Sequence, residues 1–237
     1  MRNAAAGLLA LLAQPAMAEI TGASYEGPTD RYGHGVVPGG EYAALEIRIA
    51  PDRVLGATLP LAVYEDTAPR LADLDGDGSP EVVTVISYPD AGAAVRIWDE
   101  VEAADDPRGS TIAVVAETDP IGTRFRWLAI AGIADLDGDG RMEIAYVDRP
   151  HLARVLRVVE VGPDFDLREE ASAGGHTNHR IGDPGIEGGI EDCGLGPEVL
   201  TADPGWSRIQ GTRLVAGGRL ETRDLGPYRG VLECPAQ

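Results

Sequence analysis

Two short stretches of the sequence carry closely spaced carboxylates. Leu71–Val85 reads LADLDGDGSPEVVTV and Ile133–Val147 reads IADLDGDGRMEIAYV, so the same acidic phrase begins at Asp73 and at Asp135. The two copies are 62 residues apart, the difference between 73 and 135. Adjacent carboxylates repel one another unless a cation lies among them, and calcium is bound by several oxygen ligands at short range. The duplicated phrase therefore predicts two calcium-binding turns.

The expected ligands of each turn are the carboxylates at its first, third, fifth and ninth positions and the backbone carbonyl at its seventh. Gly78 and Gly140, at the sixth position, permit the sharp turn. Because all of these groups are hard oxygen donors, calcium is favoured over zinc or copper. The first turn would use Asp73, Asp75, Asp77, Ser79 and Glu81, and the second Asp135, Asp137, Asp139, Arg141 and Glu143.

The acidic turns begin like an EF-hand loop but do not end as one. The position that needs a bidentate glutamate holds Thr84 in one copy and Tyr146 in the other, and strand-forming residues follow in place of a helix. The turns are therefore expected between two strands, where calcium would act as a structural staple. The sequence leaves open the alternative of plain Asp-Gly hairpin turns with solvated charges.

A second candidate site gathers around the histidines. The segment HTNHRIGD contains His176, His179, Arg180 and Asp183, and RYGHG supplies His34. Histidine suits acid–base catalysis and metal binding, so these five residues form a possible ligand-binding site. The four residues of HTNHRIGD would alternatively serve a small secreted hydrolase or lyase. Polar loop histidines that hydrogen-bond to the backbone are the other interpretation, and no GxSxG, HExxH or phosphate-loop motif is present.

The aromatic residues and the net charge bear on possible partners. Trp98, Trp127, Trp206 and the seven tyrosines could form a surface for a carbohydrate or a peptide, or they could pack in the core. A formal net charge of −19 argues against a nucleic-acid partner, because phosphate binding needs a basic surface. The expected partner is an unidentified protein, small molecule or carbohydrate.

The elements that must position these residues are predicted to be strands. Short segments rich in β-branched residues alternate with glycine- and proline-containing turns, which is typical of an all-β domain. Only 154–161 is ambiguous, since its polar residues recur at every third position, but its valines favour a strand. The predicted strands are 41–49, 80–87, 93–100, 110–117, 126–134, 142–148, 154–161, 197–203, 207–215 and 219–225.

The acidic phrase belongs to a longer repeat. A degenerate third copy, GGIEDCGLGPEVLTAD at Gly188–Asp203, aligns Asp192 with the first aspartate and Glu198 with the final glutamate. A fainter copy without the aspartates lies upstream, in YGHGVVPGGEYAALEI. Four units of roughly 55 residues would fill residues 19–237, each with room for three or four antiparallel strands, the size of a propeller blade.

The acidic phrases resemble the FG-GAP/VCBS repeat family, whose repeats build β-propellers such as those of integrin α chains. The resemblance implies that the turn D-x-D-x-D-G-x-x-[D/E] lies between two strands of one blade and binds calcium. It covers the two strong copies and the degenerate one, which has lost its middle aspartates and is not expected to bind metal. The resemblance thus implies a small β-propeller-like domain of about four blades, with two structural calcium ions and no assigned catalytic residue.

Features near the two ends indicate export. Residues 1–18, MRNAAAGLLALLAQPAMA, have the positive start, apolar run and small-x-small end of a signal peptide, although a buried N-terminal element is the alternative. The domain would then span 19–237 and be periplasmic or extracellular, without a transmembrane segment. In such a compartment Cys193 and Cys234 are expected to form a disulfide, and two buried free thiols are the alternative. A closed ring would also bring 20–32 beside 228–234, with 228–234 as a last strand.

Overall fold

The computed structural model describes residues 19–107 and 109–235, so the predicted signal peptide, 1–18, lies outside the described residues. Sixteen strands and one short 3-10 turn, Pro163–Phe165, make up the regular structure. All sheets are antiparallel, which confirms the predicted all-β class. No helix in the described part of the chain is long and apolar enough to cross a membrane.

The first sheet has eight strands, in the order β1-β2-β4-β6-β7-β8, with β3 beside β2 and β5 beside β6. Every pair in this sheet joins strands that are next to each other or one strand apart in the sequence. The bounds are β1 Ile20–Pro28, β2 Glu41–Ile49, β3 Arg53–Thr58, β4 Val63–Glu65, β5 Arg70–Ala72, β6 Glu81–Tyr88, β7 Gly92–Glu102 and β8 Ser110–Glu117.

The second and third sheets are four-stranded meanders, in the orders β12-β11-β10-β9 and β13-β14-β15-β16. One repeated turn lies between β9 and β10 in the second sheet, and another lies between β13 and β14 in the third. The bounds are β9 Leu128–Ala134, β10 Met142–Asp148, β11 Val155–Val161, β12 Leu167–Gly174, β13 Gly189–Asp192, β14 Pro197–Ala202, β15 Arg208–Val215 and β16 Arg219–Pro227.

Ten of the eleven predicted strands coincide with observed strands, and the ambiguous segment 154–161 contains β11. Six strands were not predicted: β1, β3, β4, β5, β12 and β13. Two of these, β4 and β5, are only three residues long, and β12 is largely polar. Neither length nor hydrophobic alternation therefore identifies these three as strands. The strand expected within 228–234 is wrong, because that segment is irregular.

The repeat is visible in the strand order. The units β5–β8, β9–β12 and β13–β16 each begin with strand, repeated turn, strand. The remaining four strands, β1–β4, do not form a separate sheet, because β4 pairs with both β2 and β6 and so joins them to the first repeat unit. The described strands therefore form three sheets, where the sequence predicted about four blades.

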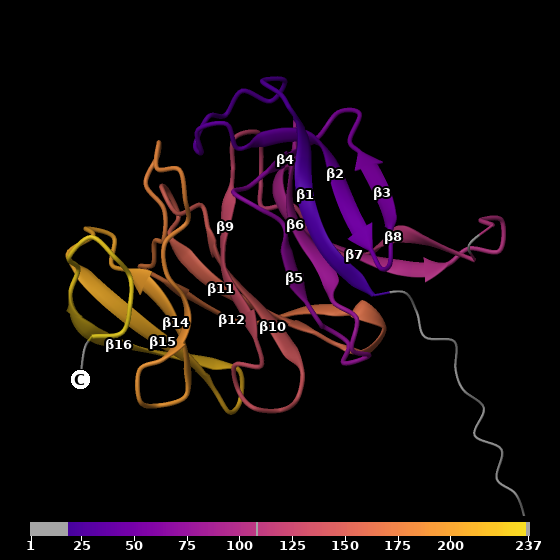
Figure 1. Ribbon diagram of the computed structural model, residues 1–237. Coiled ribbons are helices and arrows are strands. Elements are labelled where there is room, and N and C mark those ends of the chain that lie inside the picture. The colour runs from indigo at the N-terminus through magenta and orange to yellow at the C-terminus, as the bar shows by residue number, and fades with distance from the viewer. Residues whose placement is uncertain (1–18, 108, 236–237) are drawn as a thin grey trace, which may run out of the picture.

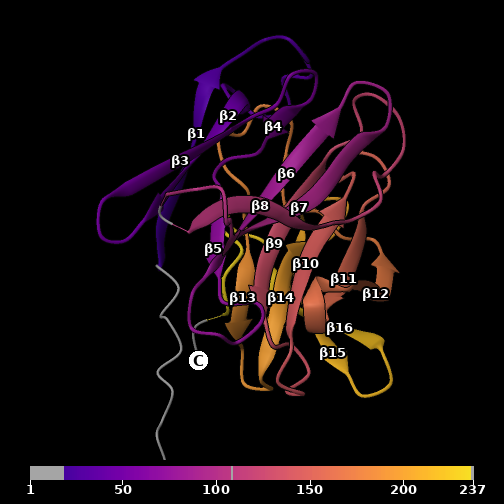
Figure 2. The ribbon, with the colours of Figure 1, turned by 90° about the vertical axis from the view of Figure 1, so that its right-hand side faces the viewer.

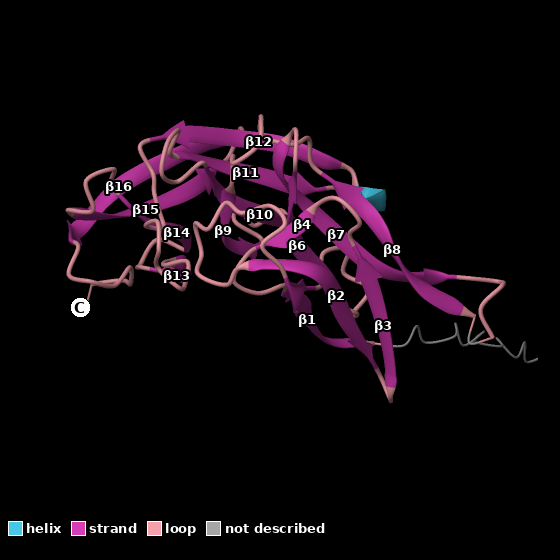
Figure 3. Ribbon diagram, turned by 90° about the horizontal axis from the view of Figure 1, so that it is seen from above, coloured by secondary structure: helices cyan, strands magenta, loops and turns pink. Residues whose placement is uncertain are grey.

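Apolar side chains fill the space between neighbouring sheets, so each sheet buries its face against the next. Ile97, Leu128 and Ile144 belong to the cluster between the first and second sheets. Val147 and Leu214 belong to the cluster between the second and third. Figure 3 shows the three sheets following one another along an arc.

The two ends of this arc do not meet. In Figures 1 and 3, β1 and the C-terminus lie on opposite sides of the molecule, and β1 and β16 belong to different sheets. The prediction that 20–32 adjoins 228–234 is therefore wrong. The repeated turns β5–β6, β9–β10 and β13–β14 all lie at the lower end in Figures 1 and 2, away from the loops that join successive units.

Candidate functional site

The two acidic turns have the same backbone geometry. In the first, the carboxylate of Asp73 accepts the N–H groups of Gly76 and Gly78, at 2.8 and 3.2 Å. In the second, Asp135 accepts from Gly138 and Gly140 at 2.7 and 3.1 Å. Gly78 and Gly140 both have φ 93°, a left-handed conformation that favours glycine. The repeated sequence therefore folds into one repeated, concave turn.

Each acidic turn brings three carboxylates together. Oxygen atoms of Asp73, Asp75 and Glu81 lie within 4.8 Å of one another, as do those of Asp135, Asp137 and Glu143. Asp77 and Asp139 lie outside these groups, and their carboxylates accept the N–H of Ser79 and Arg141 at 2.7 and 2.9 Å. The third-position and ninth-position carboxylates thus converge with the first, and the fifth-position carboxylate braces the turn.

The ninth-position glutamates are buried, at 1% and 0% exposure for Glu81 and Glu143. One oxygen of each accepts the N–H of Leu74 or Leu136 at 2.6 Å, and the other oxygen of Glu143 is buried without a hydrogen-bond partner. Burial, reinforced by the neighbouring aspartates, raises the pKa of Glu81 to about 8 and that of Glu143 to about 7. An all-oxygen donor set with a buried, uncompensated carboxylate fits a hard cation such as calcium.

Further carboxylates lie beside the turns. The spacing of the motif did not reveal these carboxylates. Burial raises the pKa of Asp99, on β7 beside the first turn, to about 6. Glu160 pairs in register with Glu143 and binds Arg168, at 3.1 Å, and the side chain of Arg141, at 2.9 Å. These residues come from neighbouring strands, so only the strand register could have indicated them.

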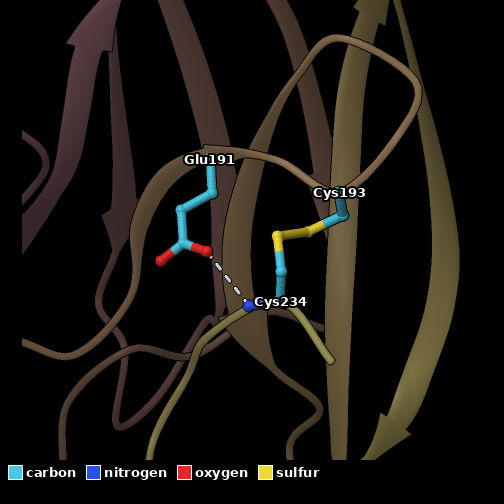
Figure 4. Close-up of side chains that lie close together, drawn as sticks. All are labelled: Glu191, Cys193 and Cys234. Atoms are coloured by element: carbon cyan, nitrogen blue, oxygen red, sulfur yellow. Dashed lines mark hydrogen bonds between the residues drawn. A yellow bond between two sulfur atoms is a disulfide. The ribbon is translucent and has the colours of Figure 1, made fainter. Parts of the chain in front are cut away.

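The degenerate third turn keeps the first aspartate but not the carboxylate cluster. Asp192 accepts the N–H groups of Gly194 and Gly196 at 2.7 and 3.0 Å, and these two backbone hydrogen bonds lower its pKa. Cys193 and Cys234 form a disulfide, which confirms the predicted bond. Figure 4 shows the carboxylate of Glu191 beside this bond, where it accepts the N–H of Cys234 at 3.0 Å.

An arginine compensates the buried glutamate of the third turn. Glu198 is 0% exposed, and Arg223 donates to its two oxygens at 2.8 and 2.6 Å. The same guanidinium donates to the carbonyl of Cys193 at 3.0 Å. A Cβ atom on Gly211, between them on β15, would lie 2.8 Å from Glu198 Oε1. The missing side chain at position 211 therefore lets Arg223 reach across β15.

The histidines of HTNHRIGD are buried and face different partners. A ring nitrogen of His176 lies 2.9 Å from Thr201 Oγ1, and burial lowers the pKa of His176 to about 4. His179 hydrogen-bonds to the carbonyl of Asp183 at 3.0 Å and to His151 at 2.9 Å, and burial lowers its pKa. The two side chains therefore sit in separate hydrogen-bonded environments.

Arg180 and Asp183 lie 3.6 Å apart as an ion pair near the surface. The guanidinium of Arg180 also covers the ring of Trp206, 3.6 Å from its centroid. Trp98 and Trp127 are buried, whereas Trp206 is partly exposed and packs on Tyr228. Two of the three tryptophans thus belong to the interior.

His34 lies in a different place, bonded to a buried glutamate. Its Nδ1 is 2.7 Å from Oε1 of Glu65, which is 1% exposed. Phe125 stacks on the His34 ring with 5.0 Å between centroids. His34 therefore lies in the loop after β1, is bound by Glu65, and lines a small pocket together with His151.

Neither a protein-family model nor a curated protein matches this chain. The evidence for a function therefore comes from the geometry of the turns and of the pocket. This geometry separates two kinds of site, an oxygen-rich pair of turns at one end of the sheets and a histidine-lined pocket among the loops at the other.

Proposed function

We propose that this chain is an exported, calcium-binding all-β domain that acts as a binding module for a protein or small-molecule ligand. Calcium has a structural role in this proposal, at one site in each acidic turn. The observation that supports the proposal most is that both turns, in different sheets, gather two aspartates around a buried glutamate. Such groups are stabilised when a cation lies among them.

The propeller-like architecture and the likeness to FG-GAP/VCBS repeats are part of this proposal. Their support is the recurrence of four-stranded units, three of which carry the turn between their first and second strands. Export is supported by the disulfide, since disulfides persist in oxidising compartments. A binding role is favoured because calcium in these turns would stabilise the fold, while the loops at the other end are left to contact a ligand.

Calorimetric titration of the calcium-depleted mature protein tests the metal sites directly. We expect two calcium ions per chain and a higher melting temperature in calcium than in chelator. Asp75→Ala and Asp137→Ala should each remove one site, because each removes a carboxylate from one group. Asp192→Ala, in the third turn, is the matched control and should leave both sites. Titration without measurable calcium binding would refute the calcium proposal.

A further inference from the structure

A pocket of about 230 Å³ lies among the loops at the opposite end from the acidic turns. Four loops contribute to it: those between β1 and β2, β8 and β9, β10 and β11, and β12 and β13. Its lining includes His34, Phe125, Arg126, Arg149 and His151. We call it the histidine pocket. The volume is at the small end of ligand pockets and suits a small organic molecule.

Buried carboxylates set the position of the β1–β2 loop at this pocket. Glu41 accepts the N–H groups of Gly33, His34 and Gly35, at 2.9, 2.6 and 3.2 Å. Glu65 holds His34 Nδ1, and its backbone carbonyl accepts the indole N–H of Trp127 at 2.7 Å. No described residue hydrogen-bonds to His34 Nε2. The imidazole is therefore pre-oriented, with one ring nitrogen available to a ligand.

The lining is cationic although the chain is strongly acidic. No aspartate or glutamate lines the pocket, whereas Arg126 and Arg149 do, on a chain with 39 acidic and 20 basic residues. Burial lowers the pKa of His151 to about 4, so this histidine adds no positive charge at neutral pH. Arg149 shares its carboxylate partner, Asp148, with Arg157, but Arg157 also pairs with Glu169, so these two arginines are balanced by two carboxylates. Arg126 has no ion pair among the described residues and supplies the uncompensated charge of the lining. Arg124 lies over the ring of Phe125 at 4.7 Å and adds a further positive charge nearby. This local field favours an anion.

The histidine pocket also has apolar walls, formed by Phe125, Leu152 and Ile181 among others. Phe125 and Arg149 have φ of 61° and 48°, a left-handed conformation that non-glycine residues adopt rarely and that recurs at functional sites. Leu152 and Ile181 are 63% and 69% exposed, so apolar surface stands at the rim without cover. A ligand with a flat apolar body would cover these side chains.

We propose that the histidine pocket binds a small organic carboxylate whose planar apolar body packs between Phe125 and the rim, with its carboxylate toward Arg126 and Arg149. This inference rests on the proposed binding function and names the class of ligand. Bidentate hydrogen bonding makes guanidinium groups suited to carboxylates. The apolar contacts select against inorganic anions, which lack a body to fill the pocket.

Three probes of similar size test the charge preference: benzoate, benzamide and benzylamine. Each is titrated into calcium-loaded protein, and binding is followed by the indole N–H resonance of Trp127, a residue that lines the pocket. Benzoate should bind at least about tenfold more tightly than benzamide, and benzylamine should not bind. Arg126→Gln and Arg149→Gln should each weaken benzoate about tenfold and leave benzamide unchanged.

Arg219→Gln is the control, because Arg219 is exposed on β16 and pairs only locally, with Glu221 at 2.6 Å. Arg126→Gln leaves no carboxylate unpaired among the described residues, so it remains informative if Arg149→Gln unfolds the protein. Equal affinity for the three probes, or an unmoved Trp127 resonance, overturns the inference. The chelator-induced change in melting temperature, measured on the same samples, separates this outcome from failure of the calcium sites.

Discussion

The acidic turns and the third turn each bury a glutamate, but its surroundings differ between them. Glu81, Glu143 and Glu198 occupy equivalent positions and are all almost completely buried. Glu198 is neutralised by Arg223 from its own sheet, whereas the other two are surrounded by further carboxylates. A buried carboxylate needs a positive partner. The third turn thus carries its cation in the chain, whereas under the proposed function the first two take theirs from solvent.

The strand register explains why no arginine crosses the second sheet as Arg223 crosses the third. On the face that holds Glu198, Leu200 pairs with Gly211, and Gly211 pairs with Arg223 on the outer strand. In the second sheet the corresponding positions are Val158, opposite Ala145, and Ala171 beyond it. Val158 is buried, so its side chain occupies the space through which Arg223 passes in the third sheet.

Removing the disulfide should cost more stability than losing either calcium ion and should act on the third turn alone. Cys193→Ser with Cys234→Ser opens a loop whose ends are 41 residues apart, for which chain entropy gives a loss of about 4 kcal/mol. The free energy of unfolding is measured by urea titration. The chelator-induced change in stability should persist in this variant. Equal stability of the variant and the parent would contradict a stabilising role for the bond.

Chelation should act on the acidic turns alone. At calcium about 100-fold above the dissociation constant, each site would add about 2.7 kcal/mol to the free energy of unfolding. Asp75→Ala and Asp137→Ala should each lose roughly half of the chelator response, since the two turns have matching geometry. Asp192→Ala should keep all of it. If Asp75→Ala and Asp137→Ala both lose as much stability in chelator as the parent does, the acidic turns do not differ from the third turn in binding calcium.

The acidic turns were predictable because their geometry is local. The positions of three aspartates, a glycine and a glutamate within nine residues define the fold of the turn. The ten strands with alternating or β-branched composition were predictable for the same reason. The pair of Glu198 and Arg223 was not, because it depends on the register of three strands and on a glycine in the middle one. The histidine pocket depends on four loops that are distant in sequence.

Acidification should weaken the third unit through His176, independently of calcium. Because burial lowers the folded-state pKa of His176 to about 4, only the unfolded chain takes up its proton as the pH falls below the ordinary value. Stability is therefore complete above about pH 6.5 and is lost towards pH 4, by about 2 kcal/mol at pH 5. His176→Gln should reduce this pH dependence in chelator. An identical pH profile in parent and variant would exclude His176 as its source.

The smallest expected effect comes from filling the space that Arg223 crosses. In Gly211→Ala the new Cβ would lie 2.8 Å from Glu198 Oε1 and 2.9 Å from Leu225 Cδ1. Glu198 cannot move aside freely, since both of its oxygens accept hydrogen bonds from Arg223. Overpacking of this kind should cost about 1 kcal/mol, with no change in the chelator response.

Gly189→Ala is the matched control for Gly211→Ala, because it lies in the same sheet and a Cβ there meets nothing within 4 Å. Its stability should stay close to that of the parent. If Gly211→Ala is no more destabilising than this control, the carboxylate of Glu198 has another position available. The arginine would then be one of several ways to neutralise the third turn. If Gly211→Ala also makes the third turn responsive to calcium, displacement of Arg223 has exposed Glu198 to a solvent cation, which would sharpen the equivalence of the three turns.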